Sequence, residues 1–441
     1  MNNEETVPVT IEKLISGGRG MARWKGQVLL VPFVLPGEEV DVRILLQKKD
    51  YLLGEAVAWK STHASRVIAP CPWFGQCGGC HLQMADYPLQ TELKSQILAE
   101  TLLRNGGISI SPLPPVSAPE PYHYRQRVKL QTGFVNGKPM TGFYRAQSRA
   151  LVPVDHCEIL KPELNSLIEE INRFLSTLAP SSPLSGEWHG VLSPDGKERL
   201  LELRLGTHQP VPSRLEVLDQ FFRTVSGFRV VARNKVLQAR GKQFLEYFVP
   251  HPVKPGISFK FRAGFQVFSQ ANDSINLKLA KTLLEWTGLS GKEQILELYA
   301  GNGNFTLFLS ALGAKVTAIE ENLLAANELQ FNLMQNRLGN VSVRRGSTGE
   351  VLKRWDIKRE KIDLLVADPP REGIDPETLR GILRILPPKI YYISCDPVTL
   401  ARDLKKLSVR YQVQKIVPFD MFPQTAHLET LTELHLKNTE G

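Results

Sequence analysis

Residues 391–397 read YYISCDP and place a cysteine directly after a run of apolar and small residues. The run predicts a buried strand over Ile390–Ser394, followed by a turn at Asp396-Pro397 and a helix over Val398–Leu407. Ligands of an open α/β sheet bind outside the carboxyl ends of its strands, so Cys395 would face a substrate. Free cysteines are also common in protein cores, and this stretch alone leaves both interpretations open.

A glycine loop lies upstream, where residues 294–307 read QILELYAGNGNFTL and predict a strand, a loop and a helix. Gly301 and Gly303 allow the backbone to approach a ligand closely. The next predicted strand, Lys315–Ile319, ends in Glu320, which is placed to accept hydrogen bonds from ribose hydroxyls. The loop lacks the third glycine of a dinucleotide fingerprint, which favours S-adenosylmethionine over NAD.

Two further segments place acids where strands begin or end. A strand predicted over 362–367 ends in Asp368, which opens the turn DPPR, although aspartate is also a common residue in ordinary turns. Enzymes that methylate exocyclic base amines carry an aromatic residue after this turn, and Arg371 stands there instead. Residues 420–429 read DMFPQTAHLE and precede a predicted edge strand over 430–436. We interpret Glu429 as a catalytic base and His427 as a structural residue.

The charge balance and the cysteine count limit the class of protein. With 54 Lys+Arg against 45 Asp+Glu, the net charge of +9 fits a polyanionic partner, nucleic acid before membrane. The sequence shows no apolar targeting segment, and no apolar run approaches the length of a membrane span. An odd number of cysteines without a signal peptide predicts a reducing, cytoplasmic location, where clustered cysteines bind metal or act in catalysis.

Four of the five cysteines predict one metal site. Cys71, Cys77 and Cys80 are separated by five and then two residues, and Cys157 follows after 76 more. A cubane iron–sulfur cluster takes four cysteine ligands, whereas a structural zinc site usually shows two C-x₂-C pairs. Only one such pair is present, so the spacing favours [4Fe–4S] and leaves zinc as the alternative.

Alternating cations at Arg125, Arg127 and Lys129 suggest a strand face that binds phosphates, with Tyr122 and Tyr124 available for stacking on bases. The same pattern would also suit the solvated outer face of an ordinary sheet.

Taken together, the motifs resemble those of RNA uracil-5-methyltransferases. The likeness is carried by the glycine loop, by DPPR, by SCDPVTLARD at 394–403 and by DMFPQTAHLE, while GGRGMAR at 17–23 resembles a TRAM domain. The resemblance implies a multidomain α/β chain. Its predicted parts are a TRAM/OB-like β-barrel (1–62), an α+β central domain with an iron–sulfur site (63–262) and a Rossmann-like class I S-adenosylmethionine-dependent methyltransferase domain (263–441).

Carried over to this sequence, the resemblance implies a role for each matching residue. Cys395 would be the nucleophile and Glu429 the base. The expected contacts to S-adenosylmethionine are Gln266, Tyr299, Gly301, Glu320 and Asp368. The expected cluster ligands are Cys71, Cys77, Cys80 and Cys157. One departure is the stretch 264–268, GFQVF, where the family usually has an aromatic-aromatic-Gln-x-Asn run.

The residue types also follow from the chemistry of uracil. Its C5 atom is a poor nucleophile until a thiolate adds to C6 and converts the ring to an enolate. A base must then remove the C5 hydrogen so that the thiolate can leave. The target base must be flipped out or single-stranded, which calls for a stacking platform.

We therefore predict a cytoplasmic, monomeric enzyme that methylates a uridine of RNA and has no membrane partner. The TRAM-like barrel and the four-cysteine site resemble the 23S ribosomal RNA branch, and transfer RNA is the alternative substrate. A non-catalytic RNA-binding protein or chaperone is disfavoured because Cys395 and Glu429 occur together. A radical or redox enzyme is disfavoured because it would leave one iron without a cysteine ligand.

Overall fold

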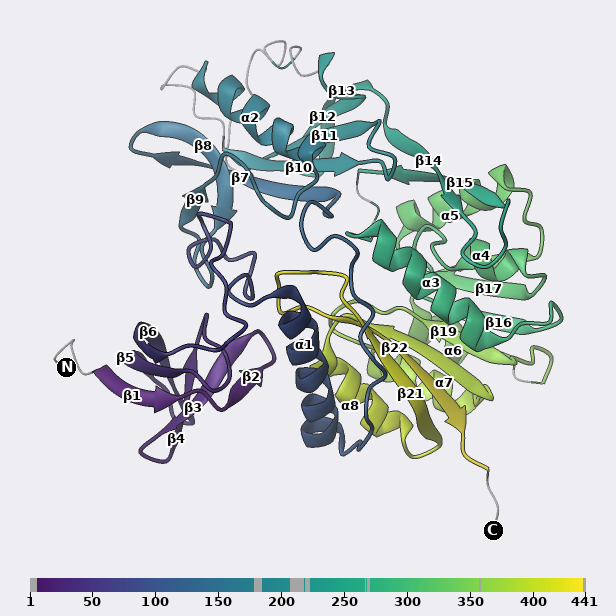
Figure 1. Ribbon diagram of the computed structural model, residues 1–441. Helices are drawn as coiled ribbons and strands as arrows, with labels where there is room; N and C mark the ends of the chain where they lie inside the picture. Colours follow the sequence, from purple (N-terminus) through teal and green to yellow (C-terminus); the bar gives the residue numbers. More distant parts are fainter. Residues whose placement is uncertain are drawn as a thin grey trace.

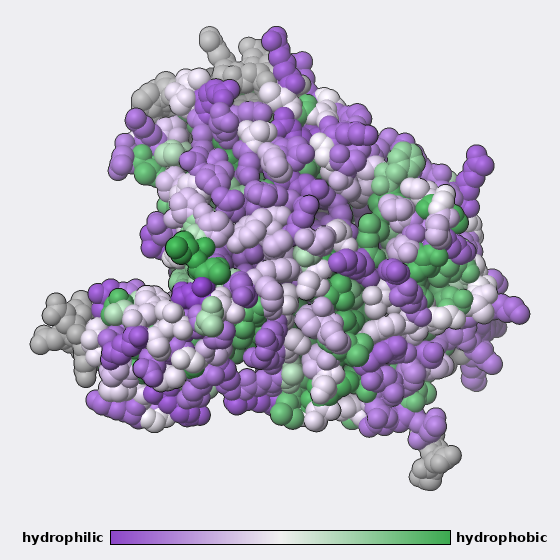
Figure 2. Space-filling view, viewed as in Figure 1, coloured by the Kyte–Doolittle hydropathy of each residue, from purple (hydrophilic) through white to green (hydrophobic). Residues whose placement is uncertain are grey.

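The computed structural model describes residues 6–177, 185–206, 218, 223–265, 267, 270–356 and 358–438. Its sheets form three lobes, with β1–β6 in one, β7–β13 in a second and β16–β22 in the third (Figure 1). Figure 2 shows a mainly hydrophilic face on which hydrophobic side chains form separate small patches. Among the described residues, no helix combines the length and the hydrophobicity that crossing a membrane requires.

The N-terminal sheet has six strands in the order β1-β5-β6-β4-β3-β2. Their bounds are β1 Thr6–Thr10, β2 Lys13–Ile15, β3 Arg19–Trp24, β4 Gln27–Val31, β5 Glu39–Gln47 and β6 Tyr51–Ser61. Exposed and buried residues alternate along β1, which is the pattern of a strand with one face on a core. Val7, Leu29 and Val42 are buried in that core.

The central sheet has seven strands in the order β13-β12-β11-β10-β7-β8-β9. Their bounds are β7 Arg127–Val135, β8 Lys138–Tyr144, β9 Leu151–Pro153, β10 Gly186–Leu192, β11 Arg199–Leu205, β12 Gly227–Ala232 and β13 Lys235–Gly241. Helix α2, Pro162–Ser176, has an apolar stripe that includes Leu167, Ile171 and Phe174 and packs on the sheet beside Trp188. The hairpin of β14, Phe244–Pro250, and β15, Ser258–Gly264, leads to the third lobe.

The C-terminal sheet has seven strands in the order β18-β17-β16-β19-β20-β22-β21. The strands are β16 Gln294–Leu298, β17 Lys315–Glu320, β18 Val341–Arg345, β19 Leu364–Ala367, β20 Lys389–Ser394, β21 Tyr411–Phe419 and β22 Glu429–Leu436. The helices are α3 Asp273–Thr287, α4 Thr306–Ala311, α5 Leu323–Gln335, α6 Thr348–Lys353, α7 Pro376–Ile385 and α8 Pro397–Leu407. The first five strands are parallel, and β22 pairs antiparallel with both β20 and β21.

The predicted position of the last strand was wrong. Residues 430–436 were expected to form an edge strand, but β22 lies between two other strands and β21 takes the edge. The first six residues of β22 are all buried, because strands flank it on both sides and helices cover the sheet. The polar residues of its alternating sequence therefore lie inside the protein.

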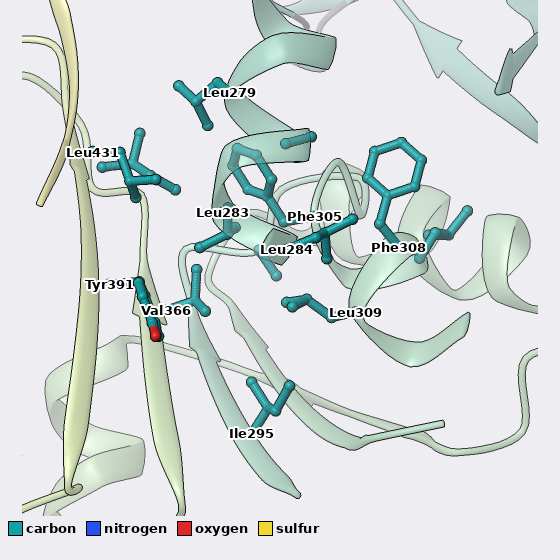
Figure 3. Close-up of a cluster of buried hydrophobic side chains, with 14 of the residues drawn as sticks. Leu279, Leu283, Leu284, Ile295, Phe305, Phe308, Leu309, Val366, Tyr391 and Leu431 are labelled. Atoms are coloured by element: carbon teal, nitrogen blue, oxygen red, sulfur yellow. The ribbon is translucent and has the colours of Figure 1, made fainter. Parts of the chain in front are cut away.

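Both faces of this sheet carry a hydrophobic core. Figure 3 shows Leu279, Leu283 and Leu284 of α3 directed toward side chains of the strands, including Val366 and Tyr391. Tyr392, the next residue of β20, belongs to the cluster on the opposite face. This division is expected because successive side chains of a strand point to opposite faces. It places the strand before Cys395 in a fully packed environment.

Helix α1, Tyr87–Thr101, packs on the C-terminal lobe although it precedes the central sheet in sequence (Figure 1). Its Leu98, with Leu102 of the following π-helical turn Leu102–Gly106, joins Leu404 of α8 in one buried cluster. The linker that follows runs along β21, where the backbone N–H of Val116 donates to the carbonyl of Pro418 at 2.8 Å. The predicted domain limits 1–62, 63–262 and 263–441 stay predictions. The segment from α1 to Val116 falls within the predicted central domain, but it packs on the predicted methyltransferase domain.

We expect Leu98→Ala to lower the free energy of unfolding by about 2–5 kcal/mol, because Leu98 is completely buried and truncation leaves a cavity. Leu103→Ala is the matched control, since Leu103 is 55% exposed and its truncation should change the unfolding free energy by less than about 0.5 kcal/mol. Urea denaturation of both variants measures the difference. Equal effects would contradict the packing of α1 on α8.

Candidate active site

Cys395 lies between the end of β20 and the start of α8. On the strand side, the hydroxyl of Thr430 in β22 donates to the carbonyl of Ser394 at 3.1 Å. On the helix side, the carboxylate of Asp396 caps α8 by accepting from the backbone N–H groups of Val398 at 2.8 Å and Thr399 at 3.0 Å. The half-buried thiol is thus held at the carboxyl edge of the sheet, where the sequence placed it.

Asp368 and Glu429 are brought to the same edge by the neighbouring strands. Asp368 follows β19 directly, and its backbone N–H donates to the carbonyl of Leu298 at the end of β16 at 3.4 Å. Glu429 is the first residue of β22, and the next residue, Thr430, pairs with Ser394. Because β19, β20 and β22 are adjacent, Asp368, Cys395 and Glu429 meet at one place although the first and the last are 61 positions apart in the sequence.

Burial makes this site unfavourable for negative charge. Burial raises the pKa of Asp368 to about 7. Burial and then the nearby Asp368 raise the pKa of Glu429 well above its ordinary value, and Arg371 opposes the shift. Burial and then Glu429 raise the pKa of the Cys395 thiol to about 12, again opposed by Arg371. At neutral pH the site therefore holds a thiol and at least one protonated carboxyl group.

The glycine loop lies beside these acids and has the shape of a ligand cradle. Gly301 has a φ of 59°, and a Cβ atom built on it would meet nothing within 4 Å, so the backbone borders open space there. Gly303, with a φ of 99°, is required for a different reason: a Cβ atom would lie 2.6 Å from the side chain of Leu307. Glu320 accepts a hydrogen bond from the N–H of Gly301 at 2.8 Å, which fixes the loop against the end of β17.

Tyr299 precedes this loop in a left-handed conformation, with a φ of 61°. Its hydroxyl donates to the carboxylate of Asp375 at 3.4 Å. In this type of fold, an adenosine moiety is held by exposed backbone, by an acid at the end of the second strand and by an aromatic ring at the loop. The residues fit S-adenosylmethionine. Gln266, the remaining expected contact, lies outside the described residues.

The residues beside Gln266 are tied to the central sheet. The guanidinium of Arg127 donates to the carbonyl of Val267 at 2.6 Å and to that of Phe265 at 3.2 Å. The ring of Phe265 is buried, with the guanidinium of Arg229 4.2 Å from its centre. In the altered stretch 264–268, Phe265 is thus a packing residue.

The expected phosphate-binding face was therefore wrong in part. Arg127 is directed into the protein toward backbone carbonyls, because β7 begins at this residue and runs beside the 265–267 loop. Tyr124 is also buried, and its hydroxyl donates to the carbonyl of Pro423 at 3.0 Å, so it is not available to stack on a base. Lys129 remains on the surface, where it pairs with Glu187.

His427 precedes Glu429 by two residues in the segment 420–429, which we name the catalytic loop after its predicted role. Its ring packs edge-on against His81, with the ring centres 5.9 Å apart. Burial and then the charge of Arg371 lower the pKa of His427 to about 4, so the imidazole is neutral at physiological pH. These contacts agree with a packing role for His427.

The four N-terminal cysteines line one cavity of about 490 Å³. Its other walls are largely apolar and include Trp73, Phe74 and Phe143. Burial, as the first cause, raises the pKa of Cys80 to about 12 and of Cys157 to about 11. His156 and Glu158 line the same cavity as the four sulfurs.

No group of three or more His, Cys, Asp or Glu side chains among the described residues is arranged to hold a metal ion. Sulfurs on one zinc ion would lie about 3.8 Å apart, because each Zn–S bond is about 2.3 Å long. A cubane spreads its four thiolates over four corners, so its ligands lie farther apart than those of one ion. The sulfur spacing expected of the two kinds of site therefore differs.

Sequence reasoning missed the residues that hold the catalytic loop. Lys94 of α1 is 1% exposed and its ammonium donates to Asp420 at 2.6 Å, and Gln90 of the same helix bonds with Gln424. The sequence contained a signal for this buried contact, because Lys94 follows Leu93 on the apolar face of α1. A charged residue on such a face is almost never buried without a partner.

Comparisons with known proteins agree with this arrangement. Residues 111–437 match the tRNA (Uracil-5-)-methyltransferase family and residues 2–57 match the TRAM domain. The 23S rRNA (uracil(1939)-C(5))-methyltransferase RlmD of Klebsiella pneumoniae is 31% identical over 438 residues, which cover 98% of this chain and 96% of that protein. An uncharacterized RNA methyltransferase of Halalkalibacterium halodurans is 28% identical over 458 residues, covering 99% and 98%.

A solved structure shows the same fold. The tRNA (uracil-54, C5)-methyltransferase of Pyrococcus abyssi, in complex with S-adenosyl-L-homocysteine, superposes with a TM-score of 0.74. The superposition covers 97% of this chain and 99% of that one at 24% sequence identity.

The raised pKa of Cys395 predicts slow alkylation of this residue at neutral pH. The reactive form is the thiolate, so the rate with iodoacetamide should rise about tenfold for each pH unit between 7 and 9. The modified fraction of the peptide that contains Cys395, followed by mass spectrometry in the absence of RNA, measures the rate. A rate that does not change over this range would show that the thiolate is already formed and would contradict the assigned shift.

Proposed function

The chain belongs to the tRNA (uracil-5-)-methyltransferase family, and we propose that it methylates C5 of a uridine in 23S ribosomal RNA, with Cys395 as nucleophile and Glu429 as base. The observation that carries this proposal is the meeting of Cys395, Glu429 and Asp368 beside the glycine loop. The reaction needs a thiol, a base and a methyl donor within reach of one pyrimidine ring. S-adenosylmethionine supplies the methyl group and brings a positively charged sulfonium to the site.

Residues of this chain would carry out the addition to the base and the final elimination. The sulfur of Cys395 forms a bond to C6, and the electron pair of the C5–C6 double bond moves into the ring as an enolate. C5 takes the methyl group, which leaves a saturated C5 that still carries its hydrogen. Glu429 removes this proton, the C5–C6 double bond forms again and the Cys395 thiolate is expelled.

The buried acids have to ionise before these steps can occur. Burial keeps Glu429 protonated and Cys395 in the thiol form. A positive charge placed beside them lowers the pKa values of both, as Arg371 already does. Asp368, with a pKa near 7, would be ionised by a smaller change. The site would thus become reactive only when it is loaded.

The choice of RNA rests on the domains and on the relatives. The N-terminal TRAM domain and the four-cysteine site resemble the ribosomal branch, and the Klebsiella relative that acts on 23S rRNA matches almost the whole chain. Transfer RNA is the second candidate, because the Pyrococcus protein of the same fold acts on tRNA. The test below includes both RNAs.

An RNA that contains 5-fluorouridine should trap the enzyme, because fluorine cannot be removed as a proton. With S-adenosylmethionine present, we expect a covalent protein–RNA complex on a denaturing gel with 23S rRNA fragments and a weaker one or none with transfer RNA. Cys395→Ala should abolish the complex. A complex only with transfer RNA would reverse the choice of substrate, and no complex with either RNA would contradict the proposed activity.

Glu429→Gln separates the role of the base from that of the nucleophile. On ordinary uridine RNA this variant should accumulate the methylated covalent complex, since addition and methyl transfer remain possible while elimination is slowed. We expect turnover to fall about 10²–10⁴-fold, the usual contribution of a general base. Product formation is measured with methyl-labelled S-adenosylmethionine. A variant that forms neither product nor complex would show that Glu429 acts before methyl transfer.

We further propose that Cys71, Cys77, Cys80 and Cys157 hold a [4Fe–4S] cluster with a structural role. The four sulfurs line the cavity together with His156 and Glu158, and its largely apolar walls would keep water from such a cluster. The cluster would join the loop 71–80 to residue 157 at the edge of the central domain. It takes no part in the steps above.

Protein purified without oxygen should contain about four irons and four acid-labile sulfides per chain. Cys157→Ala should lose most of this iron, because the cavity then offers only three thiols. Cys395→Ala is the matched control and should keep the full content, since Cys395 lies outside the cavity. One zinc per chain without labile sulfide would contradict the cluster and support the zinc alternative.

A further inference from the structure

Gln424 is the point at which three separate segments hold the catalytic loop. Its backbone N–H donates to the side-chain oxygen of Gln90 at 3.0 Å, and its own side-chain oxygen accepts from the amide of Gln90 at 2.9 Å. Its side-chain amide donates to the carbonyl of Pro121 at 3.4 Å. Its carbonyl accepts from the N–H groups of His81 at 2.9 Å and Leu82 at 3.0 Å.

The backbone of Gln424 has an unfavourable conformation that these bonds maintain. Its φ of 69° lies in the left-handed region, which a non-glycine residue seldom adopts. Such residues persist where their surroundings determine them, and they are concentrated at functional sites. Gln424 and Gln90 are each 1% exposed, so their side-chain amides need hydrogen-bond partners inside the protein.

The rest of the loop is fixed from the same side. The buried ammonium of Lys94 in α1 contacts Asp420 at 2.6 Å and the carbonyl of Phe422 at 3.0 Å. Toward Glu429, the N–H of Ala426 donates to the ring of His81 at 3.4 Å. The loop that ends in Glu429 is thus attached to α1 and to the segment that follows Cys80.

We propose that Gln90 and Gln424 are positioning residues that set the geometry of Glu429 against the base. This inference rests on the proposed function and extends it, because it assigns to α1 and to the segment after the cysteines a role in the last chemical step. Cys395 and the glycine loop are held by other strands. Disturbing the amide pair should therefore slow proton removal while addition and methyl transfer continue.

Gln90→Met and Gln424→Met test the proposal, since methionine keeps the length of the side chain and removes its hydrogen bonds. On ordinary uridine RNA, we expect the covalent complex at steady state to increase and turnover to fall, each about three- to tenfold, the factor that corresponds to one net hydrogen bond. The rate of complex formation with 5-fluorouridine RNA should equal that of the wild type. The effects of the double variant should be less than additive, because both single variants lose the bond from the side-chain amide of Gln90 to the side-chain oxygen of Gln424.

Gln96→Met is the matched control. Gln96 lies on the exposed face of α1 and bonds only with Glu92 among the described contacts, so its replacement should leave every rate unchanged. If the methionine variants do not fold, Gln424→Gly takes their place, because glycine accepts the left-handed φ and removes the side chain while it keeps the backbone N–H and carbonyl. It should show the same accumulation on ordinary RNA.

The outcomes separate this inference from the activity on which it rests. If wild-type protein forms no complex with 5-fluorouridine RNA, the proposed function fails. If the wild type does form it, and the variants lose complex and product in equal proportion, the amide pair only stabilises the fold and the inference fails. Unchanged variants would overturn it as well.

Discussion

The direction of one strand sets up the catalytic site. Parallel strands of a sheet all end at the same edge, so Asp368 and Cys395, which directly follow β19 and β20, both lie there. A further strand parallel to β20 could also bring a base to that edge at its end, but a parallel strand would require another crossover helix. β22 runs antiparallel to β20, so its first residue, Glu429, reaches the edge where the others end. The loop before β22 then has to be held from outside the sheet, and α1 and the segment after Cys80 do so.

Much of this could be predicted from local sequence. The strand before Cys395, the glycine loop with Glu320 and the helix cap at Asp396 each depend on residues close together in the chain. The same is true of the β-strands of the TRAM domain. Short-range hydrophobic patterns and turn residues determine such elements, and their spacing places chemistry at the strand ends.

The rest depended on contacts between distant residues. The interior position of β22 follows from its pairing with β20. An alternating sequence pattern cannot distinguish a buried face of a strand from a solvent-exposed face when the polar residues find partners inside the protein. Arg127 was expected to bind phosphate, but it is enclosed by the 265–267 loop, whose carbonyls lie about 140 positions away in the sequence. The pairing of Gln90 with Gln424 spans 334 positions and leaves no mark in the local pattern of either segment.

The ion pair between Lys94 and Asp420, 326 positions apart, has a consequence for how the chain is made. Helix α1 leaves the ribosome long before α8 and β22 have been translated. Until then Leu98 and Lys94 lack the partners that α8 and Asp420 provide. Domains generally fold from the N-terminal end during synthesis, and surface left uncovered in that interval favours misassembly. The TRAM domain can fold early, but α1 cannot complete its packing until the final strands have emerged from the ribosome.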